Sequence, residues 1–319
     1  MYLLTKSFQH FPGIGPRRTE QLSNAGIHDW NDLVKRSSAG LPFPQSVSQG
    51  LAESAQESLN ALYERDLNYF IERLNCANRW RLLHDFWKDC TYLDIETSGL
   101  DYDAVITVIS CWNGESLKIF VNGENLDDFP DYVLNVPLLV TFNGSTFDLP
   151  VIRRHFNLPE LPVPHVDMRW ICRRCDLTGG LKPIEHKLHL KRPDDLVGTD
   201  GNEAIMLWEQ WSNLHDESAK RKLIRYCAAD TIALQHVTAR ILAEQSGDKS
   251  CFSVDASSQW KLLNDAFPPI PTTVRPLSSV QPVVSPAPIP DADATADKSP
   301  RLSVLQQRLK AFLDTKRRH

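Results

Sequence analysis

Short hydrophobic segments typical of β-strands occur five times between residues 88 and 245, where they are mixed with helical patterns. The first three, TYLDI, AVITVISC and SLKIFVN, follow one another with short connections, which predicts an antiparallel meander. PLLVTF and VPHVDM are each followed by a helical pattern, which predicts strands that join the sheet in parallel. The pattern therefore predicts an α/β fold with a mixed five-stranded sheet flanked by helices.

Helical spacing of apolar residues marks the segments on both sides of these strands. Residues 1–40 contain two short helical patterns around a Gly-rich turn, and residues 45–80 are predicted to be helical. In residues 222–242, 100° per residue places the apolar side chains on one side of a helix. The charged residues fall on the opposite half, which predicts a solvent-exposed face: Arg221, Lys222, Arg225, His236 and Arg240.

The periodic pattern ends after about residue 246. Residues 268–300 are rich in Pro, Ala and Ser, which is typical of a linker that cannot pack a core. We therefore divide the chain into five parts. They are a small all-α segment (1–40), a helical connector (41–87), the α/β domain (88–245), a largely disordered Pro-rich linker (246–300) and a basic amphipathic tail helix (301–319).

Composition narrows the class of protein. Of the 319 residues, 42% are hydrophobic and 24% are charged, and the net charge of −5 gives no global signature of nucleic-acid binding. The sequence contains no stretch of about 18 uncharged apolar residues, so we expect no membrane span. Its N-terminus lacks the pattern of a secretory signal. Seven scattered cysteines indicate reduced thiols, so we expect a cytoplasmic protein.

Two acids interrupt the first predicted strand, in TYLDIETSGL. Asp94 and Glu96 alternate with Leu93 and Ile95, so the two carboxylates share one side of the strand, roughly 7 Å apart. Like charges so placed repel, and carboxylates inside a fold are costly unless something offsets their charge. We therefore expect a positively charged group beside them.

Two further acids point to the same chemistry. Asp230 falls at about 340° in the apolar stripe of the helix over 222–242, bordered by Tyr226, and Asp148 falls in the first turn of a helix that begins near Thr146. Taken singly, Asp230 could be a structural hydrogen-bonding group and Asp148 a residue that compensates the helix dipole. With no inward-facing Lys or Arg to match them, four carboxylates instead favour two Mg²⁺ or Mn²⁺ ions and phosphodiester hydrolysis.

The three acidic segments YLDIETSGL, FNGSTFDLP and YCAAD resemble, in order, the motifs of ribonuclease H-like 3′→5′ exonucleases with four acidic residues (the DEDD group). GGLKPIEHKL and DGNEAIMLW are similar to the YprB-like branch. The resemblance spans residues 88–243 and implies a ribonuclease H-like sheet, a hydrolase and nucleic acid as partner.

Carried over by position, the resemblance implies metal binding and catalysis by Asp94, Glu96, Asp148 and Asp230. Tyr226, four residues before Asp230, matches the residue that orients the attacking water in the tyrosine (DEDDy) subclass; the histidine subclass would have His at position 225, which is Arg. Relatives commonly carry Asn where this chain has Cys227.

The N-terminal FPGIGPRRTEQLSNAGI resembles a helix-hairpin-helix motif, which binds phosphate through backbone N–H groups without reading sequence. The resemblance implies nucleic-acid contacts by Gly13, Ile14, Gly15 and Arg17, and we assign a further contact to Asn143 of the second acidic motif. Such modules more often bind DNA than RNA, so we favour DNA. A protein-interaction role for this helical hairpin stays open.

A possible zinc site is weaker. Cys172 and Cys175 precede His186 and His189, but the gap between the histidines is short and only one CxxC is present, which argues against zinc. The basic tail could raise the affinity for nucleic acid, or a protein partner could bind through residues 268–319. A merely soluble terminus is the third alternative. The sequence thus favours a 3′→5′ exonuclease; the alternative is a catalytically weak nucleic-acid-binding or scaffold protein on the same fold.

Overall fold

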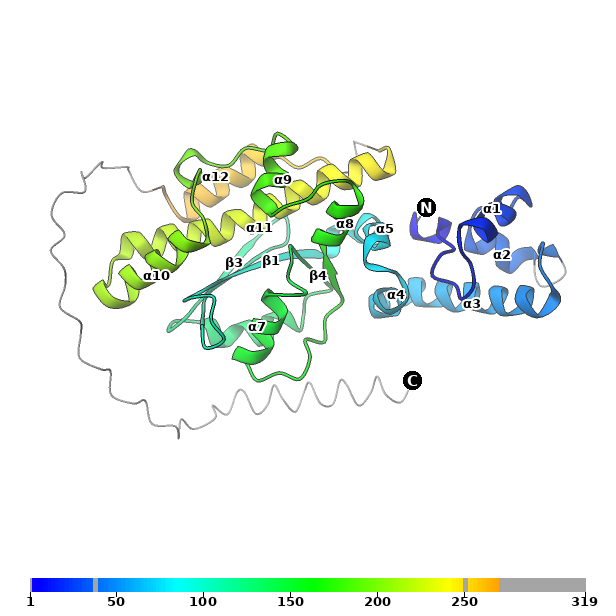
Figure 1. The fold of residues 1–319 in the computed structure, drawn as a ribbon, viewed down its shortest axis with the longest axis horizontal. Coiled ribbons are helices and arrows are strands. Elements are labelled where there is room, and N and C mark those ends of the chain that lie inside the picture. Colours follow the sequence, from blue (N-terminus) through cyan, green and yellow to red (C-terminus); the bar gives the residue numbers. More distant parts are fainter. Residues whose placement is uncertain (1, 37–39, 249–251, 270–319) are drawn as a thin grey trace.

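The structure is a computed structural model, and it describes residues 2–36, 40–248 and 252–269. These residues form an elongated molecule, with the sheet and its helices at one end and the N-terminal helices at the other (Figure 1). Residues 270–300 of the predicted linker and the predicted tail helix at 301–319 lie outside the described residues. Within the described ranges, no helix is both long enough and apolar enough to cross a bilayer.

Five strands form one mixed sheet in the order β3-β2-β1-β4-β5. The central strand β1 pairs antiparallel with β2 and parallel with β4, while β3 and β5 form the edges. The strands are β1 (Cys90–Thr97), β2 (Ile106–Trp112), β3 (Leu117–Val121), β4 (Leu138–Thr141) and β5 (His165–Asp167). The predicted mixed five-stranded sheet, with its antiparallel meander and its parallel additions, is confirmed.

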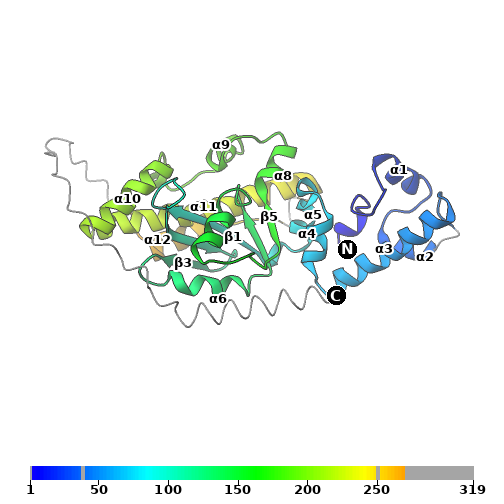
Figure 2. The same cartoon turned by 60° about the horizontal axis from the view of Figure 1, so that its bottom comes forward.

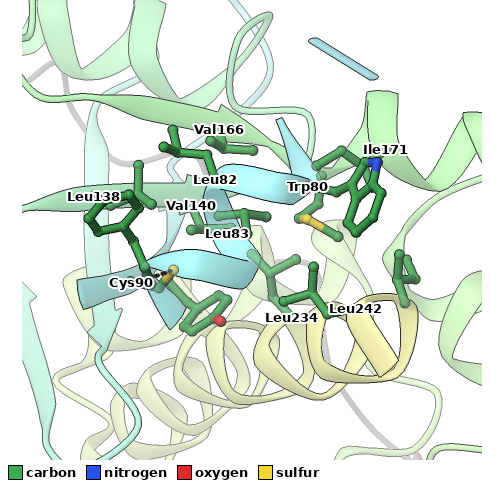
Figure 3. Packing of buried hydrophobic residues seen from close by; sticks show 14 of the residues in the cluster. Trp80, Leu82, Leu83, Cys90, Leu138, Val140, Val166, Ile171, Leu234 and Leu242 are labelled. Atoms are coloured by element: carbon green, nitrogen blue, oxygen red, sulfur yellow. Dashed lines mark hydrogen bonds between the residues drawn. The ribbon is translucent and has the colours of Figure 1, made fainter. Parts of the chain in front are cut away.

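Helices cover both faces of the sheet because successive strand side chains point to opposite sides. Leu93 and Ile95 of β1 join one hydrophobic cluster with the residues of α6 (Phe129–Val133) and α7 (Asp148–His155). Tyr92 points the other way and joins the larger cluster with α5 (Trp80–Asp85) and α11 (Glu217–Ser246). Figure 3 shows this second cluster, in which leucines of α5 and α11 gather beside Leu138 and Val140 of β4.

The long helix α11 is the main cover of the second face. Asp216 caps its start by accepting hydrogen bonds from the backbone N–H groups of Ser218 and Ala219, and Gly247 ends it with a φ of 73°. Around it lie α8 (Met168–Arg174), α9 (Leu181–Lys187), α10 (Gly201–Leu214) and α12 (Ala256–Ala266). Short 3₁₀ turns complete the fold: η1 (Leu4–Lys6), η3 (Cys76–Asn78), η4 (Trp87–Asp89), η5 (Leu126–Asp128) and η6 (Asp194–Leu196).

The polar face predicted for α11 is wrong at two positions. Arg225 is completely buried, and its guanidinium donates to Asp195 at 2.9 Å and to Asn264 at 3.0 Å. His236 is also buried, with its Nε2 2.7 Å from Gln259 Oε1. Helical periodicity separates the two faces of α11 but does not reveal that η6 and α12 cover the polar one.

Helix α12 lies inside the segment 246–300 that was predicted to be a linker. Asp255 caps α12 by accepting from the backbone N–H of Ser258 at 3.1 Å, and Leu263 of α12 is fully buried. The stretch from 252 to 269 is therefore a packed part of the fold rather than part of a disordered linker over 246–300. Its apolar positions are few, so their spacing gave too weak a signal beside the Pro-rich residues that follow.

The N-terminal helices pack around Trp30. Its ring stacks on Phe70 with 6.0 Å between centroids, and its Nε1–H donates to Ser7 O at 2.7 Å. The helices are α1 (Pro16–Asn24), α2 (Trp30–Arg36), α3 (Gln45–Tyr63) and α4 (Leu67–Arg73). The helix predicted over 45–80 is broken at Arg65, whose φ is 58°. Segments 1–40 and 41–87 thus share a core, and the boundary drawn between them stays a prediction.

The two short N-terminal helices do not flank Gly13 and Gly15. Both glycines precede α1, and within residues 2–12 the structure has only the 3₁₀ turn η1. The turn between α1 and α2 instead contains Gly26, whose φ is 73°. The two short helices expected within residues 1–40 are thus present, and Gly15 stands at the N-cap of α1, while the FPGIG segment itself forms turns.

Candidate functional site

The two acids of β1 point toward α11, on the face opposite Leu93 and Ile95. Glu96 is 9% exposed, and its side-chain carboxylate forms no hydrogen bond or ion pair with any residue that the structure describes. Burial raises the pKa of Asp94 and of Glu96 well above the ordinary values of 3.8 and 4.5, and the Asp230 carboxylate raises both further. The fold thus provides too little positive charge to stabilise the ionised forms of both carboxyls.

Helix α11 places Tyr226, Cys227 and Asp230 beside these acids. Cys227 is completely buried, and its thiol lies 3.5 Å from Asp94 O and 3.7 Å from Asp94 Oδ2. Burial raises the pKa of this thiol well above its ordinary value, and Asp94 adds to the effect. Tyr226 is 5% exposed; burial and the Asp230 carboxylate raise the pKa of its hydroxyl, which therefore stays protonated.

Asp148 enters the centre from the first turn of α7. It is 4% exposed, and burial, with Asp167 and Asp230 nearby, raises its pKa from 3.8 to about 7. Electrostatic interactions thus connect all four predicted acids, although they come from β1, α7 and α11. The sequence prediction that these acids share one region of the fold agrees with their placement, while their catalytic roles stay a prediction.

A buried acid that sequence reasoning missed holds the loop before α7. Asp167, at the end of β5, accepts hydrogen bonds from the backbone N–H groups of Asn143 at 2.8 Å and Ser145 at 3.0 Å. It also caps α8 through the N–H of Arg169 at 3.0 Å. Gly144 completes the turn, because a Cβ there would lie 2.6 Å from Thr141 Cβ. The sequence signal was an acid directly between a strand and a helical pattern.

Two cations reach the acidic centre, which corrects the expectation that no Lys or Arg faces it. Arg192 donates to both carboxylate oxygens of Glu185, at 2.7 and 2.5 Å, and to the Asp230 carboxylate. Lys182 donates to the Tyr226 hydroxyl at 2.6 Å, and its charge counteracts the rise in the Glu96 pKa. Both come from α9 and the loop that follows it, so only the folded chain places them beside the acids.

The predicted phosphate-binding residues do not all meet at this centre. Gly13, Ile14, Gly15 and Arg17 belong to the N-terminal helical region, at the far end of the molecule in both views (Figures 1 and 2). The Ile14 side chain is buried in that region. Asn143 does lie beside the centre, with a φ of 66°, and its side-chain oxygen accepts from Thr146 Oγ1 at 2.8 Å and from Arg169.

One group of side chains has the spacing of a cation site in the described part of the chain. The ligand atoms of Asp94, Glu96 and Cys227 all lie within 4.8 Å of one another. Asp148 and Asp230 stand outside that group, and so do Cys172 and His186, which belong to the weaker zinc pattern. Two hard carboxylates and an excess of negative charge fit a divalent cation such as Mg²⁺ or Mn²⁺.

Comparisons with known proteins give a family match, a similar solved structure and no curated relative. Residues 91–242 match the family model described as RNase_H superfamily. Among solved structures, the family B DNA polymerase from the hyperthermophilic archaeon Pyrobaculum calidifontis is similar over 56% of this chain at 12% identity, with a TM-score of 0.37; the match covers 29% of the polymerase. The comparison with curated proteins found no match. Residues 91–242 of this chain form an RNase H-like domain.

Proposed function

We propose that this domain is a metal-dependent nuclease that hydrolyses phosphodiester bonds of nucleic acid. The observation that carries the proposal is the buried carboxylate of Glu96, which has no hydrogen-bond partner among the described residues and lies in a centre with Asp94, Asp148 and Asp230. A fold keeps such a set of ionisable groups only where something positive stabilises them. Divalent cations bind such sets and act on phosphate esters.

Each acid has a proposed task. Asp94 and Glu96 would hold a cation directly, while Asp148 and Asp230 would complete its surroundings or hold a second one. When bound, the cations would supply an activated water and charge stabilisation for the leaving oxygen. The chain itself supplies Tyr226, whose hydroxyl is held at 2.6 Å by Lys182 and can donate a hydrogen bond to the attacking water.

The finer assignments rest on the motifs. We propose a 3′→5′ exonuclease of the DEDDy type, close to the YprB-like branch, because the three acidic motifs occur in the expected order. We propose DNA as the favoured polymer because the FPGIG segment, with Gly15 capping α1, resembles a phosphate-binding module. The division at residues 40 and 87, the nucleic-acid contacts of Arg17 and Asn143, and a cytoplasmic location belong to the same proposal.

A second function is favoured by one contact. Arg192 already pairs with Asp230 while Glu185 holds its guanidinium in place. If that pair persists when a cation binds, Asp230 is not available as a ligand and the domain would bind nucleic acid with little hydrolysis. The pair is buried, so a guanidinium between two carboxylates is not readily displaced.

The test compares four proteins, each spanning residues 1–319, on labelled single- and double-stranded DNA and RNA in Mg²⁺ or Mn²⁺. The nuclease proposal expects cleavage by the wild type, its loss in Asp94→Asn and its retention in the control Glu115→Gln, which alters an exposed turn. Tyr226→Phe should cleave more slowly by about 10²-fold or more with cation affinity unchanged. Tight cation binding and polymer binding without cleavage would support the second function instead.

A further inference from the structure

The candidate cation site contains a sulfur. Cys227 Sγ stands with one oxygen of Asp94 and one of Glu96, and these three atoms lie within 4.8 Å of one another. The four predicted acids do not account for this sulfur, which belongs to a residue outside that set. A soft donor beside two hard ones changes which cations the site prefers.

The sulfur is held in place rather than free to turn away. Cys227 is completely buried in the middle of α11, between Tyr226 and Ala228, which are buried as well. Its two contacts, with the main-chain oxygen of Asp94 at 3.5 Å and with Asp94 Oδ2 at 3.7 Å, direct the thiol hydrogen at Asp94. A cation between the three donors would take the place of that hydrogen.

A second observation points to a ligand at the same place. Glu96 is 9% exposed and aimed into the centre, and within the described ranges no hydrogen bond or ion pair satisfies its carboxylate. Arg192 forms ion pairs with Glu185 and Asp230, and Lys182 donates a hydrogen bond to the Tyr226 hydroxyl. Among the described residues, the Glu96 carboxylate therefore has no Lys or Arg as an ion-pair partner.

We propose that Asp94, Glu96 and Cys227 form a site for a thiophilic divalent cation of the Zn²⁺ class, and that this cation competes with Mg²⁺ and blocks hydrolysis. A cysteine sulfur and carboxylate oxygens are ordinary zinc ligands, whereas Mg²⁺ takes oxygen. The metal–sulfur bond forms as the S–H bond breaks and its proton passes to solvent, so no oxidant is required. Cation binding stands on the geometry; the block of hydrolysis rests on the proposed function.

The test uses Co²⁺ as a spectroscopic substitute for Zn²⁺ in the full chain. Wild type should show a thiolate-to-Co²⁺ charge-transfer band that Zn²⁺ abolishes. Cys227→Ser should lack this band, and its Zn²⁺ affinity by calorimetry should fall at least about tenfold. The matched variant Cys172→Ser/Cys175→Ser removes the other closely spaced cysteines and should keep the band. A band that persists in Cys227→Ser, or that is absent from wild type, would overturn the proposal.

A second measurement does not depend on the folding of Cys227→Ser. X-ray absorption of the Cys172→Ser/Cys175→Ser protein with one equivalent of Zn²⁺ should show one sulfur neighbour among oxygens. No sulfur, or more than one, would contradict the site. Cleavage assays separate the two proposals: sulfur ligation without any Mg²⁺-dependent cleavage keeps the cation site and refutes the nuclease, and cleavage that Zn²⁺ does not inhibit refutes the block.

Discussion

Replacing Asp148 with Asn removes one ionisable group from the acidic centre and keeps a side chain of nearly the same size. Asp148 is 4% exposed, and burial, reinforced by Asp167 and Asp230, raises its pKa from 3.8 to about 7. The folded protein therefore holds this proton more tightly than the unfolded chain. The resulting stabilisation is complete below about pH 4 and is lost as the pH rises through about 7.

The size of the effect follows from the two pKa values. Each pH unit between them is worth about 1.4 kcal/mol, so the ionised carboxylate lowers the free energy of unfolding by roughly 4 kcal/mol above pH 7. At pH 5 the folded protein keeps the proton, and the same relation gives a loss below about 2 kcal/mol. Between pH 5 and pH 8, ionisation of Asp148 should therefore lower the free energy of unfolding of the metal-free wild type by roughly 2–3 kcal/mol.

Urea unfolding in EDTA at pH 5 and pH 8 measures this loss directly. Asp148→Asn should be more stable than wild type at pH 8, with a gap roughly 2–3 kcal/mol larger than the gap at pH 5. Glu115→Gln, a change in an exposed turn, should follow wild type at both values. Equal pH dependence in Asp148→Asn and wild type would refute the placement of Asp148 as a buried, raised carboxylate.

Two further predictions concern the framework of the site. Gly144→Ala should destabilise the protein by about 2 kcal/mol or more in urea unfolding, because the new Cβ would clash with Thr141. The control Gly50→Ala, on α3 with no atom near the new Cβ, should stabilise it by about 0.5–1 kcal/mol. Similar effects of the two changes would contradict the close approach at Gly144. Arg225→Met should lower the free energy of unfolding by about 3 kcal/mol, because Asp195 and Asn264 lose their buried hydrogen-bond donor. The control Arg221→Met, on the exposed face, should change the free energy of unfolding by less than about 0.5 kcal/mol. Equal losses would show that α12 does not depend on Arg225.

The sequence predicted the parts of the centre that depend on local periodicity. Asp94 and Glu96 share a face because strand side chains alternate, and Asp230 falls in the apolar stripe of α11 because helical residues repeat every 3.6 positions. Both arguments use only the neighbours in the chain. The antiparallel meander and the two parallel strands followed from the lengths of their connections in the same way, whereas the order of the five strands was not predicted.

The missed features depend on which distant segments cover a surface. Arg192 and Lys182 reach the acids because α9 and its following loop fold over β1 and α11, and no repeat in the sequence encodes that arrangement. Arg225 was assigned to solvent because α12 belongs to a segment with few apolar residues. The sequence thus predicted that metal ions alone would supply the positive charge beside these acids. In the fold, Arg192 and Lys182 supply part of it.

Product analysis of 5′-labelled DNA, incubated with residues 1–319 in Mg²⁺, tests hydrolysis at the acidic centre most directly. A 3′→5′ exonuclease should give a ladder of fragments shortened stepwise from the 3′ end, present for wild type and absent both in EDTA and in Asp94→Asn/Glu96→Gln. Intact DNA with correctly folded, cation-binding wild type would contradict the nuclease, and cleavage that survives in the double variant would place the chemistry outside the centre formed by β1, α7 and α11.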